Sequence, residues 1–393
     1  MNMSIVKNNI KAFIGLWMFS ICSVNLYAES FQPNENTVLL KVKKIDLAKK
    51  YKEKMNSNLK NINKIVRLTK DIIEKAKVSN DDMLYGEIEA VLVENKIIVE
   101  NSEQLKLYFS KLLQHRHAFK AALDYLESNN SVDANLTRAV ILTNIGQYKK
   151  ASYECKKLIG KSSLLLASTC LLHAESFQGK LLSSYTRLKN VLNNFQEEDK
   201  VLKVWAMTAL ADMANRLGNK NKALLYFSAS NKLTPNNAHI MSEMIDVLHA
   251  LNEQSMIQEI LKNDHADIKL NLRYLRSLMI TQSYNHSLHH KDLKRLNESI
   301  LLMELRQDER HYDTRAEYYT WIRLDSKKSY YWAKKNWQVT RTPAAARLLV
   351  VSEQNVKDSD AIKDVSHWVG NNKIEDSYLL KLLSDKLHQD ELT

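Results

Sequence analysis

Glycine and proline are scarce in this chain of 393 residues, with only 7 glycines and 3 prolines. Average usage would predict about 27 and about 20. Sheet proteins need both residues at their turns, and nucleotide-binding α/β folds need glycine in a phosphate loop, so both classes are disfavoured. Because 45% of the residues are hydrophobic and 26% are charged, the chain can still build a large core. The composition predicts an all-α protein.

The motifs of common enzymes are also missing. The chain has no glycine-rich phosphate loop, no HExxH, no CxxC and no nucleophile elbow. The tract NHSLHHKDL could bind a metal, but it also fits a polar loop, and DERHYDTRAE fits a helix-start charge cluster better than a catalytic one. Trp321, Trp332 and Trp337 could form a ligand patch, although their spacing favours helix packing. We therefore expect no enzyme activity, no metal and no cofactor.

The first 28 residues have the pattern of a secretory signal peptide. Two lysines without an acid precede an apolar run of 13 residues, Ala12–Val24, and a small residue follows at Ala28. A membrane span needs about 20 residues, although an uncleaved anchor remains an alternative and would allow membrane association. We expect cleavage near Ala28 and a periplasmic or secreted mature chain.

Positive charge exceeds negative charge, and the formal net charge is +12. The lysines are spread along the chain and often lie near acids, which is typical of solvated helix faces. A basic surface that binds an anionic cell-envelope polymer or lipid is the alternative. We expect no nucleic-acid partner for an exported chain.

The stretch RLGNKNKALLYFSASNKLTP contains a turn glycine, a small residue, an aromatic residue and a proline in a fixed order. With the preceding helix it predicts two helices joined at Gly218, with small residues where the backbones approach and a proline after the second helix. This pattern resembles the tetratricopeptide repeat, a 34-residue helix–turn–helix unit. The residues that carry the resemblance are Ala139, Gly146, Ala151, Gly179, Leu210, Ala211, Gly218, Ala223, Phe227 and Pro235.

The resemblance is most specific between about residues 130 and 250. It implies an α-solenoid of roughly six hairpins, because one repeat cannot bury its apolar face alone. We divide the chain into the signal peptide (1–28), degenerate N-terminal hairpins (29–129), tetratricopeptide repeats (130–268) and a C-terminal repeat-like region with a capping helix (269–393). The whole resembles exported bacterial tetratricopeptide proteins of uncharacterised function, which implies a scaffold for a protein or peptide.

The two cysteines that remain after signal removal, Cys155 and Cys170, predict a disulfide. They fall on consecutive antiparallel helices at similar distances from the intervening turn near residues 160–162. An exported chain meets an oxidising compartment, which favours the bond. Two buried thiols that act as small apolar residues are the alternative.

The resemblance also predicts where a partner binds, because first helices line the concave face of such a solenoid. The residues expected to face a ligand there are Val140, Asn144, Thr169, His173, Asp212, Asn215, Arg216, Asp246 and His249. Their carboxylates, amides and imidazoles could hydrogen-bond an extended peptide, and an ordinary solvated face is the alternative. If Asp212 and Asp246 are exposed, replacing either by alanine should change stability by no more than about 0.5 kcal/mol.

Overall fold

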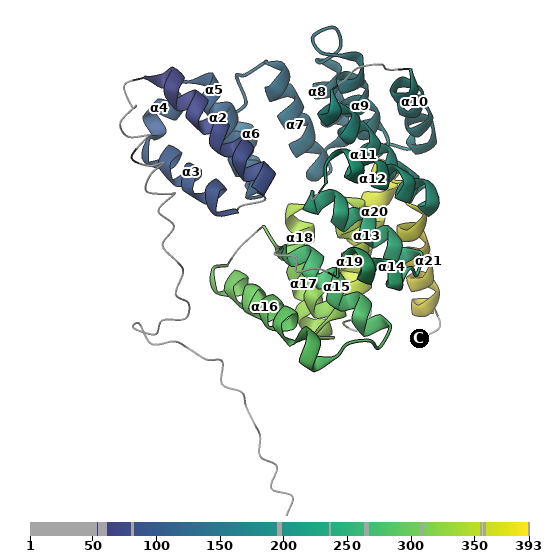
Figure 1. Ribbon diagram of the computed structural model, residues 1–393. Helices are drawn as coiled ribbons and strands as arrows, with labels where there is room; N and C mark the ends of the chain where they lie inside the picture. The colour runs from purple at the N-terminus through teal and green to yellow at the C-terminus, as the bar shows by residue number, and fades with distance from the viewer. Residues whose placement is uncertain are drawn as a thin grey trace, which may run out of the picture. The chain divides into compact units, whose positions relative to one another are not determined.

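The computed structural model describes residues 61–79, 82–194, 199–235, 237–262, 267–307, 310–353 and 359–391, with the single positions 53 and 356. These residues form helices and no strand, so the predicted all-α solenoid is confirmed (Figure 1). They all lie in one compact unit that spans residues 47–393. The predicted signal peptide lies outside the described residues. None of the helices in the described ranges is long and apolar enough to cross a bilayer.

The helices follow one another with short connections. The first are α2 (Ile62–Ser79), α3 (Asp82–Glu94), α4 (Lys96–Glu100), α5 (Glu103–His115), α6 (Phe119–Asp124), α7 (Val132–Asn144) and α8 (Tyr148–Lys156). The next are α9 (Leu164–Glu175), α10 (Leu181–Asn193), α11 (Lys200–Arg216), α12 (Lys220–Leu233), α13 (Ala238–Ala250), α14 (Gln254–Ile260) and α15 (Ile268–Ile280). The last are α16 (His286–Leu305), α17 (Tyr312–Trp321), α18 (Ser326–Val339), α19 (Pro343–Glu353), α20 (Ser359–Asn372) and α21 (Ser377–Glu391).

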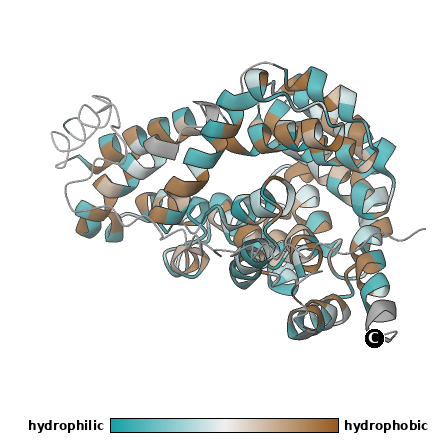
Figure 2. Cartoon of the chain, turned by 90° about the horizontal axis from the view of Figure 1, so that it is seen from below, coloured by the Kyte–Doolittle hydropathy of each residue, from teal (hydrophilic) through white to brown (hydrophobic). Residues whose placement is uncertain are grey.

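Consecutive helices from α5 to α20 form antiparallel hairpins, each with a first helix (α5, α7, α9 and so on) and a second helix (α6, α8, α10 and so on). The number of hairpins thus exceeds the roughly six expected. Most helices carry both hydrophobic and hydrophilic stretches (Figure 2), as expected of helices that bury one face. One apolar core cluster includes buried residues from Ile65 to Ile141.

Side-chain caps mark where the first helices begin. Ser131 and Ser163 accept hydrogen bonds from backbone N–H groups of α7 and α9, and Asp199 does so for α11. Asn237 and Asp267 cap α13 and α15 in the same way. Such caps satisfy amide groups that the helix itself leaves unpaired. The second helices α6, α8, α10 and α14 have no side-chain cap, whereas Asn219 caps α12.

The hairpin turns use left-handed backbone conformations. Gly146, Gly179 and Gly218 have φ angles of 76°, 71° and 80°, and Asn252 takes the corresponding place with φ 62°. Glycine adopts this region without strain, and asparagine tolerates it. Beside these turns, the motif's small and apolar residues are buried where helices meet: Ala139, Ala151, Leu210, Ala211, Ala223 and Phe227. Pro235 follows the end of α12.

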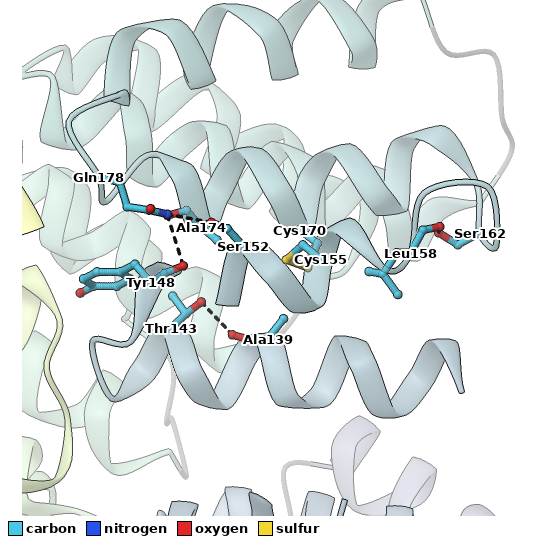
Figure 3. Close-up of a disulfide and its surroundings, with 10 residues drawn as sticks. All are labelled: Ala139, Thr143, Tyr148, Ser152, Cys155, Leu158, Ser162, Cys170, Ala174 and Gln178. Carbon is cyan, nitrogen blue, oxygen red and sulfur yellow. Dashed lines mark hydrogen bonds between the residues drawn. A yellow bond between two sulfur atoms is a disulfide. The ribbon is translucent and has the colours of Figure 1, made fainter. Parts of the chain in front are cut away.

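The predicted disulfide between Cys155 and Cys170 is confirmed. It joins α8 to α9, and the two Cα atoms are 5.5 Å apart (Figure 3). Both cysteines are buried in an apolar cluster with Ala151 and Ala174. The bond therefore links the second helix of one repeat to the first helix of the next.

Loops of the C-terminal half pack against the hairpin turns of the middle repeats, which we call the turn edge (the turns with Gly146, Gly179 and Gly218). The backbone N–H of Arg341 donates to the carbonyl of Asn144 at 2.8 Å, and the Tyr148 hydroxyl donates to the Arg341 carbonyl at 2.7 Å. The backbone N–H of Leu181 donates to Glu375 at 2.7 Å. The turn edge is therefore covered by residues almost two hundred positions further along the chain.

Candidate partner-binding surface

First helices of neighbouring repeats lie side by side, with α9 next to α11 and α15 between α13 and α17. We call the side of these helices that bears the predicted ligand-facing residues the first-helix face. It carries many charged groups, and several stay accessible to water. The side chains of His173, Asp212, Asp246, Lys269 and Asp313 are between 28% and 38% exposed.

A ladder of side chains connects α15 to α17. Lys269 Nζ lies 2.7 Å from Asp313 Oδ2, and Arg273 Nη1 lies 3.5 Å from Glu317 Oε2. On the next turn the Arg276 guanidinium lies 3.7 Å from the centre of the Trp321 ring. Lys269, Arg273 and Arg276 recur at helical spacing on α15, as Asp313, Glu317 and Trp321 do on α17, so each set occupies one side of its helix.

The ladder extends to α13 through Asp246. Its carboxylate accepts two hydrogen bonds from Arg273, at 2.9 and 2.5 Å. Two carboxylates thus share one guanidinium, and burial raises the pKa of Glu317 to about 7 although Arg273 opposes the shift. At Asp313 burial acts in the same direction, but the charge and hydrogen bond of Lys269, together with His311 and the Thr314 backbone N–H, hold the pKa of that carboxyl below its usual range. Unlike Arg273, Arg276 stacks on an indole and makes no ion pair within the described residues.

A second charged group spans α9 and α11. Arg216 Nε donates to Asp212 at 3.0 Å, and its other nitrogens donate to the carbonyl and hydroxyl of Ser176 at 3.1 and 2.5 Å. The guanidinium stacks 4.1 Å from the Phe177 ring centre. His173 Nε2 lies 3.4 Å from Asp212 Oδ2. Burial alone would raise the pKa of Asp212, but Arg216 and His173 lower it below its usual range.

The predicted ligand-facing residues are thus divided between surface and interior. Asp212, Asp246 and His173 are partly exposed on the first-helix face, and Val140, Asn144 and Asn215 are half-buried. Thr169 and Arg216 are buried, so the expectation that these two side chains are open to a ligand is wrong for this structure. Arg216 turns inward because Ser176, Phe177 and Asp212 together satisfy its charge and hydrogen bonds.

His249 is half-buried, but its ring nitrogens are not open to the surface. Its two ring nitrogens are buried beside Arg276, Asp246 and Arg273. Burial, reinforced by the Arg276 charge, lowers the pKa of His249 to about 4. The imidazole is therefore neutral at neutral pH.

Five residues of the ladder escaped the sequence analysis as binding candidates: Lys269, Arg273, Arg276, Asp313 and Glu317. A signal was present, because the basic residues of NLRYLRS and the acids of YDTRAE recur at three- and four-residue spacing. Those stretches lack the turn glycine that marks the middle repeats, so nothing in the sequence aligned them with α11 and α13.

The histidine tract is helical rather than a loop, which corrects the expectation for NHSLHHKDL. Asn285 caps α16, and His289 accepts a hydrogen bond from the Asn285 backbone N–H at 3.0 Å. Within the described parts of the chain, no group of three or more His, Cys, Asp or Glu residues is placed to hold a metal ion.

The repeat architecture follows from the hairpins themselves. Consecutive helix pairs stack, and residues with positive φ form the turns within them. Small residues lie buried where the two helices of a pair meet. The described helix pairs thus have the architecture of a tetratricopeptide-like α-solenoid. No protein-family model matches this sequence, and no curated protein matches it.

Several solved structures are similar to this chain. A tetratricopeptide repeat protein from Parabacteroides merdae is 12% identical, with a TM-score of 0.37 over 73% of this chain and 99% of that one. NprR in complex with its cognate peptide NprX is 14% identical, with a TM-score of 0.39 over 79% and 99% of the two chains. The human IFIT1 dimer with PPP-AAAA is 9% identical, with a TM-score of 0.39 over 90% and 96%.

Proposed function

We propose that this protein is an exported tetratricopeptide-like scaffold that binds a peptide segment of another protein along its first-helix face. The role is binding without catalysis, and the protein acts in the periplasm or outside the cell. The signal-peptide pattern of residues 1–28 and the Cys155–Cys170 bond both favour an oxidising compartment.

The ladder between α13, α15 and α17 is the observation that carries the proposal. It combines rigid charged groups with partial exposure, and a groove for an extended peptide needs both. The Arg276 guanidinium is held flat against Trp321, so its N–H groups can donate to a peptide carbonyl or carboxylate with little further loss of side-chain entropy. Asp246 and Asp313 could accept hydrogen bonds from peptide N–H groups or basic side chains.

The test uses peptides selected by display against the folded chain from residue 29 onward. Their affinities are compared for the parent and a double variant, His173→Ala with Arg276→Gln, by fluorescence anisotropy. We choose these two positions because neither side chain is the sole partner of a buried charge. Asp212 keeps Arg216, and Arg276 pairs with no carboxylate among the residues that the structure describes. Removing one side chain of an anchoring pair typically weakens binding by about tenfold or more.

The matched control is Leu182→Ser with Lys222→Gln, two exposed positions on the second helices α10 and α12. It should keep the parent's peptide affinity. If the double variant on the first-helix face also keeps that affinity while circular dichroism shows an intact fold, the proposed groove is wrong.

A further inference from the structure

The second helices of three consecutive repeats expose a large apolar side chain. Tyr153 of α8 is 63% exposed, Leu182 of α10 is 62% exposed and Leu225 of α12 is 70% exposed. Single exposed apolar residues are common on soluble proteins and carry little meaning. A repeated one is informative, because each repeat presents its second helix in the same way.

The turn glycines give these residues a common register. Tyr153 and Leu225 each follow their turn glycine by seven positions, and Leu182 follows Gly179 by three. Positions three and seven are one helical turn apart, so they lie on the same side of the helix. We call this side of α8, α10 and α12 the second-helix face.

Exposed lysines lie in or beside the same register. Lys149 lies three positions after Gly146, and Lys156 and Lys189 lie ten positions after their own turn glycines. Lys222 lies four positions after Gly218, beside the Leu225 stripe. All four lysines are exposed, and none pairs with a carboxylate in the part of the chain that the structure describes. Each of the three helices therefore carries an exposed apolar side chain and at least one exposed lysine on or beside this side.

Negative charge is almost missing from these three described helices. α10 and α12 contain no Asp or Glu, and α8 contains only Glu154. Glu154 is buried and accepts a hydrogen bond from Arg138 at 3.0 Å. The first-helix face differs, because Arg216, Lys269 and Arg273 pair there with carboxylates. Among the described residues, Lys149, Lys156, Lys189 and Lys222 of the second-helix face therefore have no carboxylate partner.

We infer that the second-helix face is a docking surface for a bilayer that contains anionic phospholipids. Lysines would lie at the level of the lipid headgroups, and Tyr153, Leu182 and Leu225 would enter the boundary with the acyl chains. The exposed apolar residues favour a bilayer over a soluble polyanion, which would contact the lysines and leave the apolar residues in water. This docking requires neither an uncleaved signal segment nor the peptide groove.

Co-sedimentation of the purified chain from residue 29 with lipid vesicles tests the inference. The parent should sediment with phosphatidylethanolamine–phosphatidylglycerol vesicles, but not with phosphatidylcholine vesicles, and added salt should weaken its binding. The triple change Lys149→Gln, Lys189→Gln and Lys222→Gln should lower the bound fraction by about tenfold or more. A second triple change, Tyr153→Ser, Leu182→Ser and Leu225→Ser, should also lower it.

Matched controls change the same residue types elsewhere. Lys291→Gln, Lys327→Gln and Lys381→Gln remove three exposed lysines, and Leu288→Ser, Leu301→Ser and Leu324→Ser remove three exposed leucines. Both control triples should bind vesicles like the parent. Every variant is first compared with the parent by circular dichroism, which should show no change because the replaced side chains are exposed.

Three results would overturn the inference. One is a parent that does not sediment with anionic vesicles, or that sediments equally with phosphatidylcholine vesicles. Another is a loss of binding in the control triples as large as in the variants of the second-helix face. The third is binding that depends on the lysines but not on Tyr153, Leu182 and Leu225, and that inorganic polyphosphate abolishes, because it would show a soluble-polyanion site. Peptide affinity, measured separately, should stay unchanged in all these variants.

Discussion

At the scale of single residues, two buried arginines explain why two carboxylates lie on the first-helix face. Arg216 and Arg273 are buried on first helices, and each is neutralised by a carboxylate at the edge of the solvent, Asp212 and Asp246 respectively. A carboxylate that looks like a ligand contact in the sequence can therefore be a structural counter-ion.

Replacing Asp212 by alanine should destabilise the protein more than an ordinary surface change. The variant leaves Arg216 buried with only Ser176 as a hydrogen-bond partner, so we expect the free energy of unfolding to fall by about 2 kcal/mol. The expected loss of stability is larger than the change of about 0.5 kcal/mol or less that the sequence predicted for an exposed aspartate. Urea unfolding followed by circular dichroism measures it. Asn215→Ala on the same helix is the control, and an equally small effect in both variants would contradict the counter-ion role.

His249 should make the protein less stable in mild acid. Burial lowers the pKa of His249 to about 4 in the folded state, whereas an unfolded histidine titrates near about 6.5. The unfolded chain therefore binds this proton first as the pH falls, so stability is lost between about pH 6.5 and about pH 4. In His249→Gln this loss should be smaller by about 1–2 kcal/mol.

Unfolding free energies of the parent and His249→Gln at pH 7 and pH 5 provide the measurement. The comparison between variants is necessary because Glu317, whose pKa is raised by burial, changes stability in the opposite direction over the same pH range. Identical pH dependence in both proteins would show that His249 is not held neutral.

At the scale of helices and turns, the glycines have two separate roles. Each turn glycine adopts a positive φ, which ends one helix and starts the next. On the turn edge the same glycines also allow close approach, since a Cβ on Gly146 would lie 2.7 Å from the Arg341 Cβ. Gly160 has nearly the same φ, 75°, but a Cβ there meets nothing within 4 Å.

Alanine variants of Gly146 and Gly160 separate the cost of backbone strain from the cost of disturbing a tertiary contact. Gly160→Ala should destabilise by about 1 kcal/mol, because alanine is disfavoured at positive φ. Gly146→Ala should destabilise by about 1–3 kcal/mol more, because the loop at Arg341 must also move. Thermal or urea unfolding of the two variants gives the difference directly. Equal losses of stability in the two variants would mean that the loop at Arg341 is not in close contact with the turn at Gly146.

At the scale of the whole described unit, repeats that are distant in the sequence contact one another, unlike those of a simple solenoid. Simple repeat arrays hold each repeat only against its neighbours and can unfold in parts. Here Tyr148 and Phe177 share a core with Trp337 and Trp368. The ring centroids of Tyr148 and Trp368 are 6.4 Å apart. Loss of the C-terminal helices would expose the turn edge of the middle repeats.

We therefore expect the middle and C-terminal repeats to unfold together. In hydrogen exchange at increasing urea, amides of α8 and α20 should lose protection at the same urea midpoint. The reason is that both helices contribute side chains to one shared core. Trp368→Ala should lower both midpoints equally. A lower midpoint for α20 alone would show that the C-terminal helices detach independently.

The sequence by itself determined the helices, the turn glycines of the middle repeats and the disulfide. These features depend on residues close in the chain: small side chains at fixed spacing, caps, and two cysteines flanking one turn. Only the tertiary structure decided that Arg216 is buried, that Arg273 joins Asp246 to Glu317, and that the loop at Arg341 covers Gly146. Those contacts join helices from different repeats, and sequence spacing does not encode how distant repeats meet. Burial then decides which charges pair internally and which remain free to bind a partner.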